Sequence, residues 1–135
     1  MSVFILGSYA KALVMTAERI PLAGETLIGH NFRQTWGGKG SDMAVQAARL
    51  GADVAYSGVV GNDTFGNEFI ELMQEEGINI DALTLTSELP TGAGLIIKDE
   101  EGRNVIVVDM GANKLFTPAL VDNALQQLKN SHVVL

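Results

Sequence analysis

The sequence predicts an α/β fold of three layers, in which helices cover both faces of a mostly parallel sheet. Short apolar runs at residues 3–6 and 54–60 are typical of strands that are buried on both sides. Two amphipathic segments of helical period alternate with these runs, and each is followed by a glycine, at Gly51 and at Gly77. This alternation favours βα units.

Composition limits the class of protein. With 135 residues, 47% of them apolar, and only three prolines, the chain can bury a core and should form about one domain or a large part of one. Its formal net charge of −7 argues against nucleic acids and anionic membranes as partners. The absence of cysteine excludes a disulfide scaffold, and residues 3–6 are too few for a signal peptide or a membrane span. We therefore predict a cytoplasmic protein.

The first βα unit is expected at the start of the chain. Its strand, residues 3–6, ends at Gly7 and Ser8. Beyond Ser41, apolar residues recur at helical spacing, and Gly51 stands where a left-handed residue ends many helices.

The second βα unit begins with residues 54–60 as the next parallel strand. Asp63 or Thr64 can cap the helix that follows, and Gly77 ends it. One apolar stripe runs along this helix, formed by Phe65, Phe69, Leu72 and Met73.

The remaining segments are less regular. Residues 95–98 and 104–108 flank a polar turn and predict an antiparallel hairpin, while residues 13–20 and 25–36 predict short, partly exposed strands that could form a flap. A third helix should open at residues 117–118, because a capping hydroxyl followed by proline is a favourable start. A last strand begins near the chain end, so we expect the natural sequence to continue. The expected core face of the third helix is Leu120, Val121, Ala124, Leu125 and Leu128.

A glycine-rich turn before the first helix is the strongest functional signal. Gly37, Gly38 and Gly40 let the backbone approach a ligand closely and turn helix N–H groups toward it. The alternatives are a tight structural turn, an acid at Asp42 that is favoured only by the helix dipole, and a solvated Lys39. Strand one lacks the Gly-x-Gly-x-x-Gly turn of dinucleotide-binding domains. The pattern predicts a small-molecule site.

Residues 37–44 (GGKGSDMA), together with Gly51 and Gly61, resemble the N-terminal signature of the ribokinase-like carbohydrate kinases, the PfkB family. Residues 21–26, 61–66 and 111–113 resemble further family segments. The resemblance implies a Rossmann-like ribokinase fold with a small β-sheet lid, formed here near residues 12–36 and 92–109, and makes residues 1–135 the N-terminal portion of the kinase domain. It also implies ATP-dependent phosphorylation of a hydroxyl on a sugar or sugar-like metabolite.

The resemblance assigns this chain the acceptor side of the site. It implies substrate-binding roles for Ser8, Ala10, Ala12, Gly38, Lys39, Gly40, Asp42 and Asn113. The family's catalytic aspartate and most ATP contacts lie in its C-terminal half, so no catalytic, cofactor-binding or metal-binding residue is expected here. ATP and Mg²⁺ are implied for the intact protein, and the lid also implies a possible homodimer.

Three positions depart from the family pattern. After strand one the family typically reads Gly-Ser, a hydrophobic residue, Asn, any residue, and Asp, but this chain has Ala10 and Ala12 at the two polar positions. Each change removes hydrogen bonds worth about 1 kcal/mol to a sugar hydroxyl. Asp42 stands where the family has Asn. Ribose is therefore in doubt as the acceptor.

Two alternatives stay open. One is a nucleoside or sugar-phosphate kinase of the same family, in which Lys11 or Arg33 would contact an anionic or heteroaromatic group, although Lys11 is expected to be an exposed loop residue. The other is a non-catalytic paralogue that binds sugars or nucleosides and has a regulatory role.

Overall fold

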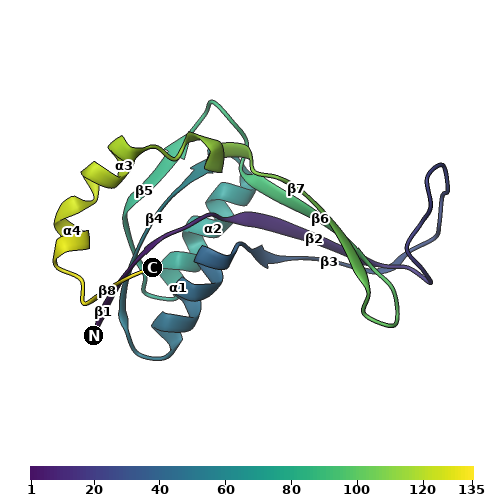
Figure 1. Ribbon diagram of the computed structural model, residues 1–135, viewed down its shortest axis with the longest axis horizontal. Coiled ribbons are helices and arrows are strands. Elements are labelled where there is room, and N and C mark those ends of the chain that lie inside the picture. Colours follow the sequence, from purple (N-terminus) through teal and green to yellow (C-terminus); the bar gives the residue numbers. More distant parts are fainter.

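The computed structural model describes residues 1–135 and contains two four-stranded sheets (Figure 1). The first, the core sheet, has the strand order β5-β4-β1-β8 and is parallel throughout. None of the helices combines the length and the apolar character that crossing a membrane requires. The strands of the core sheet are β1 (Ser2–Leu6), β4 (Asp53–Gly61), β5 (Asn79–Thr86) and β8 (Val133–Val134).

Helices α1 (Lys39–Arg49) and α2 (Thr64–Glu75) pack on one face of the core sheet. The predicted caps and stops are present: the Asp63 carboxylate accepts a hydrogen bond from the Gly66 N–H, and Gly51 and Gly77 have φ angles of +84° and +69°. Most of the predicted stripe of α2 is buried, with Phe69 and Met73 fully inaccessible, but Phe65 is only half-buried.

Helices α3 (Pro118–Asn123) and α4 (Leu125–Lys129) follow the short 3₁₀ helix η1 (Gly111–Leu115). The prediction of one continuous third helix is wrong, because the helix breaks at Ala124, which is the last cap of α3 and the first of α4. Of its predicted core face only Ala124 is buried, and Leu125 is exposed. Figure 1 shows both helices on the opposite side of the core sheet from α1 and α2.

The connections in the core sheet explain this two-sided cover. The chain runs from β1 through β4 to β5 in one direction, and then returns to place β8 on the other side of β1. Right-handed crossovers in opposite directions put their helices on opposite faces of a sheet. The carboxyl end of β1 therefore lies at the topological switch point, where open α/β sheets bind their ligands.

Strand β5 (Asn79–Thr86) is the one core strand that the sequence patterns did not single out. Its longest apolar run is two residues, and its side chains are half-buried or exposed because β5 forms an edge of the sheet. The continuous apolar run that marked β1 and β4 is the signature of interior strands, and an edge strand does not need it.

The second sheet, the lid, has the strand order β3-β2-β6-β7 and projects away from the core (Figure 1). Its hairpin of β6 and β7 is antiparallel, as expected, and β2 pairs with β6 in parallel. The short strands expected at residues 13–20 and 25–36 form only in part, because residues 17–29 are a loop. The strands of the lid are β2 (Ala10–Thr16), β3 (His30–Gly37), β6 (Gly92–Lys98) and β7 (Asn104–Asp109).

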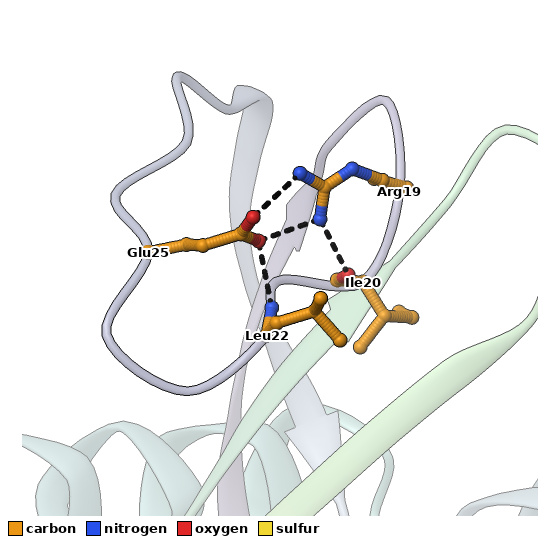
Figure 2. Close-up of polar contacts among 4 residues, drawn as sticks. All are labelled: Arg19, Ile20, Leu22 and Glu25. Carbon is orange, nitrogen blue, oxygen red and sulfur yellow. Dashed lines mark hydrogen bonds and ion pairs between the residues drawn. The ribbon is translucent and has the colours of Figure 1, made fainter.

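An ion pair closes the loop between β2 and β3 at the tip of the lid (Figure 2). The Arg19 guanidinium donates to both oxygens of Glu25, at 2.6 and 2.8 Å, and the Leu22 N–H donates to the same carboxylate at 2.8 Å. The hydrogen bonds from Arg19 and then from the Leu22 backbone lower the pKa of Glu25 to about 2. The loop thus keeps a defined shape although it is exposed.

Candidate functional site

A cavity of about 450 Å³ lies at the carboxyl end of β1, between the lid and the first turn of α1. Of the eight residues predicted for the acceptor site, seven line it: Ser8, Ala10, Ala12, Gly38, Lys39, Asp42 and Asn113. For all of them except Asn113, which comes from η1, this common position follows from the chain path, because β1 leads directly into β2, and β3 leads directly into α1.

Gly40 does not line the cavity. It is buried, and a Cβ added to it would lie 2.5 Å from the Cα of Gly7 and 3.1 Å from the backbone nitrogen of Ser8. No side chain can be accommodated at such distances, so glycine at this position lets α1 touch the loop after β1. Gly40 therefore shapes the site by close backbone packing and does not face the cavity.

The bend before α1 forms one edge of the cavity through Gly37, Gly38 and Lys39. Gly38 caps the helix with φ +100°, a conformation that favours glycine, and the first backbone hydrogen bond of the helix runs from the Asp42 N–H to the Gly38 carbonyl. The three preceding N–H groups of α1 have no partner within the helix. The Ser41 hydroxyl donates to the carbonyls of Gly37 and Gly38, which holds the bend in place.

Asn113 lines the cavity, but its side chain is fully engaged with backbone. Its oxygen accepts from the Tyr9 N–H at 3.1 Å, and its nitrogen donates to the carbonyls of Tyr9 and Met110 at 2.8 and 2.7 Å. The Tyr9 ring stacks on Phe69 in the core, 4.0 Å between centroids. Asn113 therefore ties η1 to the loop after β1 and fixes the position of that loop.

Lys39 and Asp42 are the charged groups that are free at the cavity. Both are exposed, and neither forms an ion pair. Three residues apart in the first turn of α1, they lie on the same side of the helix. The cavity thus has one cationic donor and one anionic acceptor on its helix side, together with the Ser8 hydroxyl.

The expectation of an exposed loop lysine at position 11 is wrong. Lys11 belongs to β2, its side chain is 6% exposed, and its ammonium forms an ion pair with Glu68 of α2. It also lies over the rings of Trp36 and Phe65, at 5.4 and 5.7 Å from their centroids. Lys11 therefore joins the root of the lid to the core.

A second link at the root of the lid involves Asp63. Besides capping α2, its carboxylate accepts hydrogen bonds from the Thr91 N–H and hydroxyl, both at 2.7 Å. Burial opposes ionisation of this carboxylate, but the hydrogen bonds from Thr91 and Gly66 outweigh it and hold the pKa of Asp63 below its ordinary value. The link holds the segment that leads into β6.

The sequence did not predict which residues after β2 and β3 contribute to the lid side of the cavity. Gly94 and Ile96 of β6, Ile106 and Val108 of β7, and Met110 all line it. The alternation of side chains along each strand, once the register of the hairpin is known, is the signal that would have found the strand residues.

Comparison with known proteins identifies the family. The model of the pfkB family carbohydrate kinases matches residues 2–135. Ribokinase of Bacillus subtilis is 39% identical over 134 residues, which cover 99% of this chain and 45% of that protein. The chain belongs to the pfkB family of carbohydrate kinases and spans less than half the length of this relative.

Solved structures agree with this assignment. The structure of ribokinase from Giardia lamblia superimposes with a TM-score of 0.91 at 34% identity, covering 98% of this chain and 40% of that one. Ribokinase of Arabidopsis thaliana, complexed with ribose and ATP, gives 0.86 at 27% identity, covering 98% and 43%. The fold is that of the ribokinases.

No three histidine, aspartate or glutamate side chains converge in a way that could hold an ion. None of them is therefore assigned to the Mg²⁺ that the family resemblance implies.

Proposed function

We propose that the intact protein transfers the γ-phosphoryl group of ATP to a hydroxyl of a sugar or sugar-like metabolite, and that this chain holds the acceptor. The observation that carries the proposal is the position of the cavity: it lies at the switch point of a ribokinase-type sheet, between the first turn of α1 and a lid. The Arabidopsis thaliana relative supports both the sugar and the nucleotide, because its structure contains ribose and ATP.

In this proposal the helix side of the cavity orients the acceptor. The Asp42 carboxylate accepts hydrogen bonds from hydroxyls, Lys39 and Ser8 donate to their oxygens, and the lid excludes water, which would otherwise compete as the phosphoryl acceptor. In-line transfer also requires the reacting hydroxyl to be held in one orientation. The bend from Gly38 to Asp42 supplies that constraint.

We further assign the protein to the cytoplasm and to a homodimer formed through the lid. The dimer proposal is supported by the apolar surface that the lid leaves exposed on its face opposite the cavity. Leu95 and Val107 occupy paired positions there, with exposed fractions of 58% and 70%. A second copy of the lid could cover this surface.

Of the two alternatives, the nucleoside or sugar-phosphate kinase loses its support from Lys11. Lys11 is among the residues that line the cavity, but its ammonium is paired with Glu68, and Arg33 does not line the cavity. The non-catalytic reading predicts a different result in an assay: acceptor binding without consumption of ATP.

The test is a coupled assay of ATP consumption by the intact protein over a panel of sugars. We expect turnover with at least one sugar, and a loss of at least about tenfold in kcat/KM on Asp42→Ala. Asp53→Ala is the matched control, because Asp53 is an exposed aspartate at the amino end of β4 and should leave kcat/KM unchanged. Sugar binding without turnover would establish the non-catalytic alternative, and equal losses in the two variants would remove the role of Asp42.

A further inference from the structure

The cavity has two walls of different chemistry. On one side stand the Ser8 hydroxyl, the Lys39 ammonium and the Asp42 carboxylate, and on the other stands the lid. Resting on the proposed function, we infer that the acceptor is a deoxy or C-methyl sugar, or a related alcohol, which turns an edge without hydroxyls toward the lid and its polar groups toward α1.

The side chains of the lid offer nothing to a hydroxyl. The register pairs Ala12 with Gly94 and Gly94 with Val108, so these residues share one face of the sheet, and the same alternation places their neighbours on that face. The residues of this face that line the cavity are Ala10, Ala12, Gly94, Ile96, Ile106 and Val108. None of them carries a polar atom in its side chain.

The backbone of β2 and β6, which form most of this wall, is also occupied, whereas β7 is an edge strand that pairs only with β6. Strands β2 and β6 are the two interior strands of the lid, and each is paired on both of its sides. Their N–H and C=O groups are therefore used within the sheet. A sugar hydroxyl in contact with β2 or β6 would lose its hydrogen bonds to water and gain no partner in the protein. It would therefore carry the full desolvation penalty of a buried, unpaired polar group.

The polar side chains closest to this wall are engaged elsewhere, and Lys11, although it contributes to the lining of the cavity, lies between Ala10 and Ala12 on β2 and so points to the other face of the sheet. Both ends of the Asn113 amide are bonded to backbone, and the Lys11 ammonium is bonded to Glu68. Space, in contrast, is available: a Cβ added at Gly94 would meet only a methyl of Val108, at 3.6 Å. The wall therefore accepts a methylene or methyl group and disfavours a hydroxyl.

The experiment compares pairs of acceptors that differ by a single hydroxyl. For the best pentose and the best hexose in the assay of the intact protein, kcat/KM and calorimetric affinity are measured for the parent and for each monodeoxy analogue that keeps the phosphorylated hydroxyl. We expect at least one analogue to exceed its parent by about tenfold, the cost of one unpaired hydroxyl. If every analogue is poorer than its parent, the inference is overturned although the kinase activity stands.

Variants identify the wall. Ala12→Ser and Ala10→Asn add a hydrogen-bonding group to the cavity face and should reduce or reverse the preference for the deoxy analogue. Ala93→Ser is the control, because Ala93 is next to the cavity-lining Gly94 on β6 and points to the other face of the sheet. If the preference for the deoxy analogue over its parent changes equally in all three variants, the inference is contradicted. Denaturant unfolding checks that each variant is folded, and a protein that phosphorylates no sugar would refute the proposed function and the inference together.

Discussion

Replacing Gly40 by alanine should move the start of α1 away from the loop after β1 and weaken acceptor binding. The new Cβ would lie 2.5 Å from the Cα of Gly7, whereas ordinary contacts of a Cβ begin at 3.4 Å. The two segments must therefore separate by almost an ångström. No side-chain rotation can relieve the contact, because the opposing atoms belong to the backbone.

The magnitude follows from two opposing effects. Overpacking in a close-packed interior costs about 1–3 kcal/mol, and a clash with rigid backbone belongs at the upper end. Alanine in a helix gains up to about 1 kcal/mol over glycine. The net loss of unfolding free energy should be about 2 kcal/mol. A displacement of about 1 Å in an active site can lower kcat/KM by about a hundredfold, so the functional effect should be the larger one.

The assay is denaturant unfolding together with calorimetric binding of a sugar that the intact protein phosphorylates. Gly51→Ala is the matched control: Gly51 has φ +84° at the other end of α1, and a Cβ there would meet nothing within 4 Å. The free energy of unfolding of Gly51→Ala should fall by about 1 kcal/mol, because alanine is strained in the left-handed conformation, and the variant should bind the sugar as the wild type does. If Gly40→Ala binds as tightly as Gly51→Ala, close packing of Gly40 against Gly7 does not shape the site.

Three further predictions concern the contacts around the cavity. Asp63→Asn should have a lower free energy of unfolding than the wild type near neutral pH. Because the folded-state pKa of Asp63 is lowered, this difference in stability should shrink below pH of about 4 and vanish below the folded-state pKa. A difference in stability that does not depend on pH would contradict this prediction. Glu68→Ala, which leaves the buried Lys11 ammonium unpaired, should lower the free energy of unfolding by about 3 kcal/mol, and Lys11→Met should lower it by clearly less. A larger loss in Lys11→Met would refute the prediction. Asn113→Ala should raise the Kd of the sugar without removing a direct contact, and unchanged affinity would exclude this positioning role.

Local patterns predicted the regular part of the fold. Continuous apolar runs marked β1 and β4, and helical periodicity with glycine stops marked α1 and α2, because burial on both faces and left-handed helix ends leave direct traces in sequence. The edge strand β5 leaves a weaker trace. The break at Ala124 was missed because the apolar residues around it keep helical spacing, while only Ala124 itself is buried.

The site was predictable in position but not in chemistry. The glycines before α1 and the strand end at Ser8 located it, since both are local features. The burial of Lys11 depends on Glu68, which lies 57 residues away in sequence. Whether Ala10 and Ala12 meet open solvent or an apolar wall depends on the pairing of β2 with β6, and that pairing is a long-range contact.

A crystal structure of the intact protein with a phosphorylatable sugar bound would test the central claim most directly. We expect the sugar between the lid and the first turn of α1, with its hydroxyls within hydrogen-bonding distance of the side chains of Ser8, Lys39 and Asp42. A sugar bound elsewhere, with this cavity holding only water, would contradict the assignment of the cavity as the acceptor site.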